Sequence, residues 1–326
     1  MNPHIQNIIL EATKAKEISE TEIIQNLWSD YGKIIRCSLK GSRHNSIIVK
    51  HIQLPDKNNH PRGWNTNVSH QRKLKSYQIE IEFYKSWSKY CKTSCYLPTP
   101  FYLENIDTES LIVLEDLNDS GFSERKTFVN LFEVKLCLTW LANFHACFMD
   151  KAPKDLWEIG TYWHLKTRPD ELKALLDLPL RDAASAINKT LNDCKFQTFV
   201  HGDAKLANFC FSSDSKKVAA VDFQYVGGGC GMKDIAYFLG SCLSEEECEQ
   251  LEPELLNFYF KELTLALKDK NTNIQPQDVE REWRQLYPIA QTDFHRFIKG
   301  WSPGHWKINS YSERVAQDVI SKLKNK

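Results

Sequence analysis

The segment FVHGDAKLANFCF, residues 199–211, places a short polar loop between two apolar runs. The loop carries an acid, a base and an amide at Asp203, Lys205 and Asn208. Taken alone, it could be an ordinary polar surface turn. The next residues favour more than that, because SSDSKK predicts a turn and VAAVDF predicts a second strand that ends at Asp222.

A hairpin made of these two strands would bring Asp222 back beside Asn208, although the two residues are 14 positions apart. An amide oxygen and a carboxylate are the kind of oxygen ligands that Mg²⁺ takes in proteins. Asp203 could accept the proton of a hydroxyl group, and Lys205 could place an ammonium near a phosphate. Phosphoryl transfer needs these parts, since its catalysis is mostly placement and charge stabilisation. We therefore predict Mg²⁺ at Asn208 and Asp222, with Asp203 and Lys205 as catalytic residues.

The first third of the chain is rich in β-forming residues. Runs at about 22–28, 33–39 and 46–52 are separated by WSDYG and KGSRHN, which predicts an antiparallel meander. A helical stripe of apolar residues follows at 77–87. Two further strands are predicted within residues 98–117.

Helices are predicted at four places: over 3–19, 133–149 and 170–195, and through most of the chain after 233. A chain of 326 residues exceeds what one hydrophobic core usually serves. We therefore predict an α+β fold with two lobes. A small β-rich lobe, residues 1–115, would bind a nucleotide, and a larger, mainly helical lobe, residues 116–326, would hold the catalytic and acceptor sites.

Lys50 ends the run SIIVK, where strand-forming residues precede it. A solvated lysine at a strand end is the ordinary interpretation of that position. The predicted helix further along the chain, however, offers Glu80 and Glu82 as partners. An ion pair would hold Lys50 where it can contact the α- and β-phosphates of a nucleotide. The helical periodicity leaves the choice between the two glutamates open.

Charge and cysteine usage narrow the class of protein. Lys and Arg together number 42, as do Asp and Glu, so the formal net charge is zero. No overall field then favours a nucleic acid or a membrane as partner. Ten cysteines without a C-x-x-C pair predict buried free thiols and no zinc site. With no apolar run of transmembrane length, we expect a cytoplasmic protein, and the oligomeric state is left open.

Aromatic residues in the second lobe are candidates for binding an acceptor. Trp163, Trp301 and Trp306 could line a pocket for an apolar or quaternary-ammonium compound, although aromatic residues more often pack in cores. The basic stretch 60–73 could be a lid that meets a phosphate or carboxylate, or simply a solvated loop. His145 lies on an apolar helix face and is predicted to be a core histidine.

Taken in order, these pieces resemble the kinase-like small-molecule phosphotransferases, the group that holds aminoglycoside phosphotransferases, choline kinases and ecdysteroid-kinase-like proteins. Within this group the sequence is most similar to the ecdysteroid-kinase-like branch. The segments that carry the resemblance are EIEFY at 80–84, LEDL at 114–117, LANFHA at 141–146, HGDAKLAN at 201–208 and VDFQ at 221–224.

The resemblance implies a bilobal, protein-kinase-like fold that uses ATP and Mg²⁺. It implies that Lys50 binds the α- and β-phosphates and pairs with Glu80, and that the backbone of Glu115–Leu117 meets adenine. Where this group has a glycine-rich nucleotide loop, the segment WSDYGK contains one glycine, Gly32. Such a loop can still cover phosphates through its backbone N–H groups, but it is less pliant.

For the second lobe, the resemblance implies that Asp203 is the catalytic base and that Asn208 and Asp222 bind Mg²⁺. It also implies that Asp234 steadies the catalytic loop. Lys205 departs from the group and resembles the Asp-x-Lys of protein kinases. The Phe-Gln that follows Asp222 and the lack of an A-P-E triplet argue against a protein kinase.

These observations predict an ATP- and Mg²⁺-dependent kinase whose acceptor is a hydroxyl group of a small molecule. Two alternatives stay open. The glycine-poor loop favours a nucleotide-binding sensor or scaffold without turnover, and Lys205 favours a protein kinase. A metal-dependent hydrolase would leave Lys50 and the first lobe without a role.

Overall fold

The computed structural model describes residues 1–27, 31–53, 67–106, 109–270 and 273–324. The described chain forms two compact units, each built from more than one stretch of sequence. The first unit consists of Met1–Tyr90, Tyr96–Arg125 and Cys210–Val221. The second unit consists of Cys91–Cys95, Lys126–Phe209 and Asp222–Lys326. The boundary expected from the sequence, at 115/116, follows chain order, whereas this division assigns 116–125 and 210–221 to the first unit.

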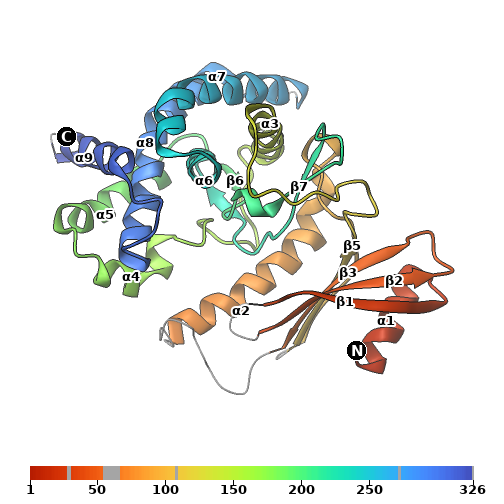
Figure 1. Ribbon diagram of the computed structural model, residues 1–326. Coiled ribbons are helices and arrows are strands. Elements are labelled where there is room, and N and C mark those ends of the chain that lie inside the picture. The colour runs from red at the N-terminus through yellow and green to blue at the C-terminus, as the bar shows by residue number, and fades with distance from the viewer. Residues whose placement is uncertain (28–30, 54–66, 107–108, 271–272, 325–326) are drawn as a thin grey trace. The chain divides into compact units, whose positions relative to one another are not determined.

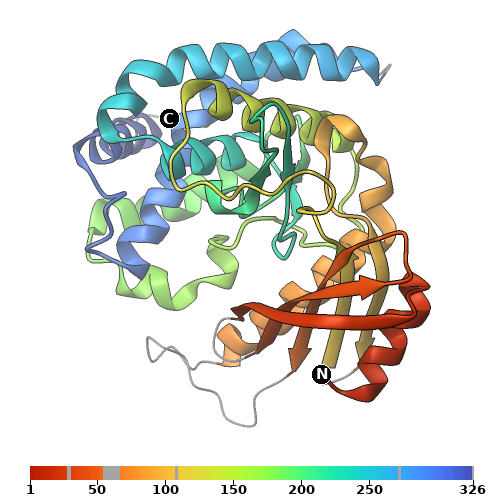
Figure 2. The same cartoon turned by 45° about the vertical axis from the view of Figure 1, so that its right-hand side comes forward.

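Among its described residues, the first unit contains a five-stranded antiparallel sheet in the order β1-β2-β3-β5-β4 (Figure 2). The strands are Glu17–Asn26 (β1), Gly32–Lys40 (β2), Ser46–Gln53 (β3), Pro100–Ile106 (β4) and Glu109–Glu115 (β5). The first three form the predicted meander, and the last two are the strands predicted within residues 98–117. The prediction succeeded because short apolar runs separated by turn residues are typical of an antiparallel sheet.

Helix α1, Pro3–Thr13, covers one face of this sheet (Figure 2). Its buried Ile5 and Ile9 pack in one cluster with residues of β2, β3 and β5. The helix predicted over 3–19 is wrong beyond Thr13, because Lys14 ends the helix in a left-handed conformation with a φ of 54°. From Glu17 onward the backbone pairs with β2 instead.

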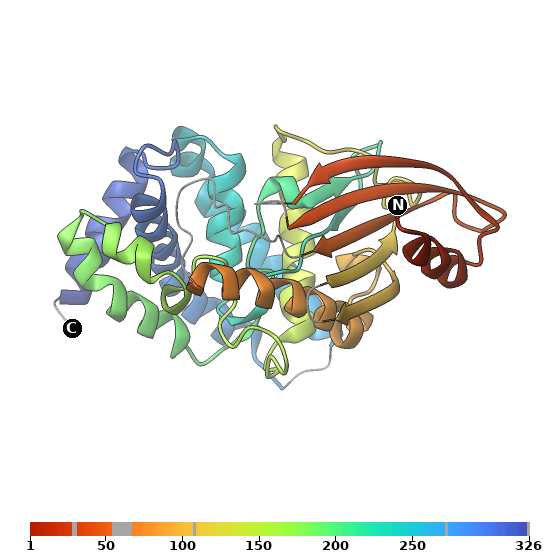
Figure 3. The ribbon, with the colours of Figure 1, turned by 90° about the horizontal axis from the view of Figure 1, so that it is seen from below.

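Helix α2, Asn67–Glu82, starts ten residues before the predicted apolar stripe and continues into a π-helical turn, Phe83–Trp87, and a 3₁₀ turn, Ser88–Tyr90. Figure 3 shows α2 beside the strands. Neighbouring residues of a strand point to opposite faces of a sheet. Val49 lies in the cluster that α1 covers, so Lys50, the next residue, points to the opposite face and reaches α2.

A short hairpin belongs to the first unit except for its first residue, Phe209. Its strands, Phe209–Phe211 (β7) and Val218–Ala220 (β8), pair as a two-stranded sheet, which confirms the predicted hairpin. Cys210 of β7 packs with Leu117 and Phe122 in one buried cluster. This packing explains why the hairpin and residues 116–125 group with the strands of the first unit.

The second unit is mainly helical, as predicted (Figure 1). Its helices are Leu131–Phe148 (α3), Pro169–Ala174 (α4), Leu178–Asn192 (α5), Met232–Cys242 (α6), Glu245–Asp269 (α7), Pro276–Trp301 (α8) and Ser310–Lys324 (α9). Short 3₁₀ turns lie at Thr93–Cys95, Leu165–Thr167 and Leu206–Asn208. Two short antiparallel strands, Thr198–Val200 (β6) and Gly227–Gly229 (β9), pair with each other in this unit.

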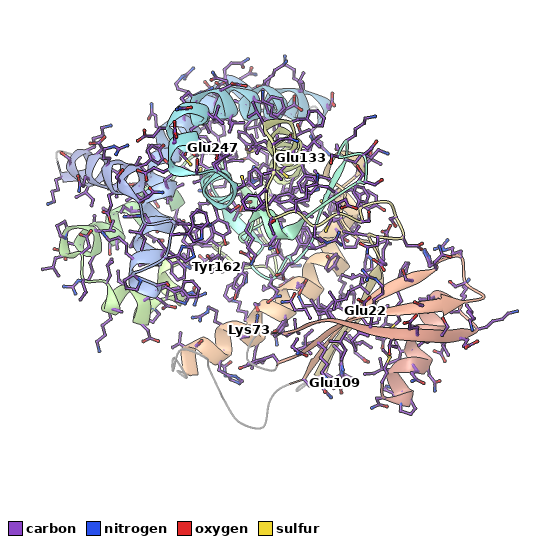
Figure 4. All side chains as sticks on the ribbon, in the orientation of Figure 1. Glu22, Lys73, Glu109, Glu133, Tyr162 and Glu247 are labelled. Carbon is purple, nitrogen blue, oxygen red and sulfur yellow. The ribbon has the colours of Figure 1, made fainter. Side chains whose placement is uncertain are left out.

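Helices α3 and α7 lie side by side and begin in the same way. Glu133 and Glu247, labelled in Figure 4, each accept the backbone N–H of the residue that caps the helix, and the cap accepts theirs. The capping residues are Asn130 and Ser244. Such reciprocal bonds satisfy backbone donors that a helix start would otherwise leave unpaired.

The ten cysteines are free thiols. Within the described ranges, no group of three or more His, Cys, Asp or Glu side chains is arranged to hold a metal ion. None of the described helices is long and apolar enough to cross a membrane.

Candidate active site

The loop HGDAKLAN connects β6 to β7, and its backbone turns sharply at Gly202. Gly202 has a φ of 79°, and a Cβ there would lie 2.1 Å from the carbonyl oxygen of Tyr225. Only glycine fits this close approach. His201 also stabilises the turn, because its Nδ1 accepts the backbone N–H of Asp203 at 3.3 Å.

Asp234, in the first turn of α6, fixes the start of the same loop. It is fully buried, and its carboxylate accepts the backbone N–H groups of His201 at 2.5 Å and Gly202 at 2.9 Å. His145 Nε2 lies 3.1 Å from the same carboxylate, and its Nδ1 lies 2.8 Å from the Tyr259 hydroxyl. Both ring nitrogens of His145 therefore have partners, and the residue is the core histidine that the sequence predicts.

The carboxylate of Asp203 has three hydrogen-bond donors around it. Its Oδ2 accepts from Lys205 Nζ at 2.9 Å and from Asn208 Nδ2 at 3.1 Å. Its Oδ1 accepts from the Tyr237 hydroxyl at 3.2 Å. A carboxylate offers about four lone-pair sites. Among the described residues, Oδ1 thus keeps one site that a further hydroxyl group could approach.

Lys205 lies between two carboxylates. Burial acts to lower its pKa, but the negative charges of Asp203 and Asp222 outweigh burial and raise the pKa above its usual value. Lys205 therefore stays an ammonium at neutral pH. Asp222 lies two residues after β8, with a φ of 70°, and its Oδ1 accepts from Gln224 Nε2 at 2.6 Å.

The predicted metal ligands offer a suitable pair of oxygens. Asn208 uses its amide nitrogen to donate to the backbone oxygen of Asp203 at 2.8 Å and to its carboxylate. The amide oxygen of Asn208 is then the atom that can accept, and Asp222 adds a half-buried carboxylate. Two such oxygens together with phosphate oxygens suit Mg²⁺, which prefers few protein ligands and keeps waters.

Two tyrosines complete the surroundings of Asp203, and the sequence analysis missed both. Tyr162, labelled in Figure 4, lies edge-on to Tyr237 with ring centroids 5.6 Å apart. Burial, Tyr162 and the negative charge of Asp203 all raise the pKa of Tyr237, so its hydroxyl stays protonated and donates. The signal that could have found Tyr237 is its position three residues after Asp234, on the same side of helix α6.

In the first unit, Lys50 Nζ lies 2.6 Å from Glu80 Oε2, so the predicted ion pair is present. The two residues are only 5% and 2% exposed. Lys50 also lies 5.7 Å from the centroid of the Tyr77 ring. Glu82, the alternative partner, instead accepts a hydrogen bond from Ser86. The structure thus settles which glutamate pairs with Lys50.

The other residues that the resemblance assigns to a nucleotide have structural roles of their own. Gly32 starts β2 with a φ of 130°, and a Cβ there would lie 2.0 Å from the carbonyl oxygen of His51. Glu115 accepts from the Tyr96 hydroxyl at 2.6 Å, and Leu117 is buried in the cluster around Phe122. Contact of Gly32, Glu115 and Leu117 with a nucleotide stays a prediction.

The three tryptophans proposed for the acceptor differ in their surroundings. Trp163 is fully buried and donates to Asp293 at 3.0 Å, so it is a core residue. Trp301 stacks on Phe297 with ring centroids 5.7 Å apart. Trp306 is 61% exposed and can face a ligand. Of the proposed lid at 60–73, residues 60–66 lie outside the described residues, and the rest form the start of α2.

The chain matches a family model over most of its length. The model describes the ecdysteroid kinase-like family and matches residues 33–156 and 161–272. A comparison with curated proteins finds no match.

Three solved structures of small-molecule kinases are similar to the chain. A microcompartment-associated aminopropanol kinase is 13% identical, with a TM-score of 0.50, covering 98% of this chain and 94% of that one. A Plasmodium vivax ethanolamine kinase is 12% identical, with a TM-score of 0.49, covering 98% and 89%. An aminoglycoside-3'-phosphotransferase of type VIII is 14% identical, with a TM-score of 0.47, covering 90% and 100%. The family match and the aminopropanol kinase structure confirm the predicted α+β, kinase-like fold.

Proposed function

Because the chain belongs to the ecdysteroid kinase-like family, we propose that it transfers the γ-phosphate of ATP to a hydroxyl group of a small molecule, with Mg²⁺ as cofactor. The observation that carries the proposal is the setting of Asp203. Its carboxylate is held by Lys205, Asn208 and Tyr237, and its Oδ1 keeps one site for an incoming hydroxyl group.

The nucleotide-binding part of the proposal rests on Lys50. A lysine that is 5% exposed and paired with Glu80 at 2.6 Å is held in one place. Its ammonium has three N–H donors, so it can bind phosphate oxygens while it keeps the glutamate. We assign it to the α- and β-phosphates, and we assign adenine to the backbone of Glu115–Leu117.

The metal-binding part rests on Asn208 and Asp222. The hydrogen bonds from the Asn208 amide nitrogen to Asp203 fix the orientation of the amide and leave its oxygen as the ligand. When bound there, Mg²⁺ would neutralise negative charge on the phosphate oxygens. Lys205 adds a positive charge that the nearby carboxylates keep protonated.

In the chemical step, Asp203 orients the acceptor hydroxyl and accepts its proton at Oδ1. Tyr237 donates to the same oxygen at 3.2 Å and so limits the directions from which the hydroxyl can approach. Lys205 lies on the other carboxylate oxygen, where it balances the charge of Asp203 without blocking that approach. This division of roles explains why one carboxylate can be both held in place and available as a base.

One observation favours a second candidate, a nucleotide-binding sensor without turnover. Gly32 is required by the close approach of the backbone at His51, so its presence is explained without a phosphate. The single glycine of that loop then adds no support for a pliant phosphate clamp. The two candidates differ in one observable, which is whether phosphate leaves ATP for an acceptor.

The test combines binding and turnover. Calorimetry would measure ATP binding with and without Mg²⁺ for the wild type, Asp203→Asn and Asp222→Asn. We expect Asp203→Asn to bind Mg·ATP normally and to lose phosphoryl transfer, whereas Asp222→Asn loses the Mg²⁺ dependence of binding. Binding by all proteins with no transfer to any acceptor would support the sensor, and no ATP binding by the wild type would reject both candidates.

A further inference from the structure

The ammonium of Lys307 lies among three aromatic rings of the second unit. Its Nζ is 4.7 Å from the ring centroid of Tyr237, 5.3 Å from that of Phe294 and 5.5 Å from that of Trp306. Aromatic groups at these distances attract a cation through the negative faces of their rings. The rings therefore form a cation site, and the protein fills it with its own side chain.

This ammonium has unused hydrogen-bonding capacity. Among the described residues, no side chain or backbone oxygen accepts a hydrogen bond from Lys307 Nζ or forms an ion pair with it. Burial lowers the pKa of Lys307 to about 8, and the positive charge of Lys205 lowers it further. Cys242, Asp203 and Cys248 act in the opposite direction and raise it. A partly buried ammonium with three unpaired donors is a position at which an anion can bind.

Lys307 contacts the same tyrosine as the oxygen that the acceptor hydroxyl would approach. The ring beneath its ammonium belongs to Tyr237, and the hydroxyl of this tyrosine donates to Asp203 Oδ1. Asp203 and Lys205 also act electrostatically on Lys307 and shift its pKa in opposite directions. Lys205 pairs with Asp203 at 2.9 Å, whereas no described carboxylate forms an ion pair with Lys307.

A cavity of about 60 Å³ opens beside the same residues. Lys307, Phe294 and Trp306 line it together with His295. His295 is only 3% exposed, and neither of its ring nitrogens makes a hydrogen bond to a described residue. Nε2 lies 3.4 Å from a Glu313 carboxylate oxygen, and burial lowers the pKa of His295, which keeps the imidazole neutral. The neutral imidazole therefore adds no second positive charge beside the cavity.

Resting on the proposed function, we propose that Lys307 is the specificity-determining residue of the acceptor site and that the acceptor carries a carboxylate rather than a quaternary ammonium. One ammonium and a neutral imidazole balance the single negative charge of a carboxylate. A quaternary ammonium would have to displace Lys307 from the rings and would meet Lys205 nearby. The carboxylate would bind Lys307 while the hydroxyl of the same molecule reaches Asp203.

Calorimetric binding of three small probes tests this assignment without requiring turnover. The probes are 4-hydroxybutyrate, choline and the neutral choline analogue 3,3-dimethylbutan-1-ol. They are titrated into the wild type, Lys307→Met, Lys307→Arg and, as a matched control on the exposed surface of α9, Lys322→Met. Lys307→Arg keeps the charge and serves as the rescue variant if Lys307→Met alters the local packing.

We expect Lys307→Met to bind 4-hydroxybutyrate at least tenfold more weakly than the wild type and choline at least tenfold more tightly. Lys307→Arg and Lys322→Met should behave like the wild type, and the neutral probe should not distinguish the proteins. Equal binding of 4-hydroxybutyrate by wild type and Lys307→Met would overturn the proposal, as would tight choline binding by the wild type or no carboxylate binding at all.

The outcome is separable from that of the proposed function. Carboxylate binding that depends on Lys307, without phosphate transfer from ATP to any acceptor, would keep the acceptor-site assignment and reject the kinase. Phosphate transfer to choline by the wild type would keep the kinase and reject the carboxylate specificity.

Discussion

Replacing Asp234 with asparagine would disturb the catalytic loop without touching Asp203. The carboxylate of Asp234 is fully buried and accepts two backbone N–H groups, those of His201 and Gly202. It also faces Nε2 of His145. Asparagine has nearly the same shape but only one oxygen. Its NH₂ group must take the place of the other oxygen, where it meets a donor instead of an acceptor.

The cost can be worked out from these contacts. One backbone N–H is left buried without a partner, which costs about 1–3 kcal/mol. The remaining hydrogen bond loses its charged acceptor and weakens by about 1 kcal/mol. We therefore expect Asp234→Asn to lower the free energy of unfolding by about 2–4 kcal/mol.

Urea unfolding followed by circular dichroism would measure this loss. Asp318→Asn is the matched control, because it makes the same chemical change at a residue that is exposed on α9. The control should stay within about 0.5 kcal/mol of the wild type. Phosphoryl transfer by Asp234→Asn should fall even at low temperature, where the protein stays folded. A loss below about 1 kcal/mol would refute the claim that Asp234 holds the loop.

Three further predictions concern ionisable side chains that are buried or partly buried. Glu80→Ala should lower the free energy of unfolding by about 3–5 kcal/mol, because it leaves the buried Lys50 without this partner. The double variant Lys50→Met/Glu80→Leu should recover most of that loss in urea unfolding. A loss under about 1 kcal/mol for Glu80→Ala would contradict a stabilising role of the ion pair. Burial lowers the pKa of His164 to about 4, below its value in an unfolded chain. Between about pH 6.5 and 4 the unfolded state is therefore protonated at this histidine while the folded state is not. As the pH drops through this range, the free energy of unfolding should fall by up to about 3 kcal/mol. In His164→Gln the free energy of unfolding should depend less on pH over this range. An unchanged dependence would contradict the role given to His164. Because the pKa of Lys307 is about 8, affinity for 4-hydroxybutyrate should decline as the pH rises above 8, and in Lys307→Arg it should not decline up to pH ~10, since an arginine stays charged.

Much of the fold could be predicted from the sequence because its signals are local. The strands β2 and β3 and the hairpin β7–β8 are short apolar runs bounded by turn residues, and such runs identify strands directly. The helix expected over 3–19 failed where the apolar pattern suits both a helix and a strand. There the long-range pairing of β1 with β2 decided the structure, and no local signal contains that pairing.

The site divides in the same way. One segment of eight residues contains Asp203, Lys205 and Asn208, so their proximity follows from their spacing along the chain. Asp222 was predicted to join them because a β-hairpin follows this segment. Residues from distant segments could not be assigned to the surroundings of Asp203 by spacing within the loop. Tyr237 comes from α6, and Lys307 follows α8, 104 residues after Asp203. Packing of helices brings them there, and the sequence does not state which faces of those helices meet.

The choice between Glu80 and Glu82 shows the limit of periodicity. Both glutamates lie near the end of α2, and two positions along a helix change the direction of a side chain by about 200°. The apolar stripe of α2 is irregular, so the sequence did not fix which face meets the sheet. Only the packing of the helix on the strands selects Glu80 for Lys50.

The central claim is that Asp203 serves as the base in phosphate transfer from ATP to a hydroxyl group. The most direct measurement incubates the wild type, Asp203→Asn and Asp318→Asn with Mg·ATP and a panel of hydroxylated metabolites, and detects phosphorylated products by mass spectrometry. We predict a product with the wild type and the control that falls at least a hundredfold in Asp203→Asn. A product formed equally well by Asp203→Asn, or no product from any protein that binds Mg·ATP, would contradict the account.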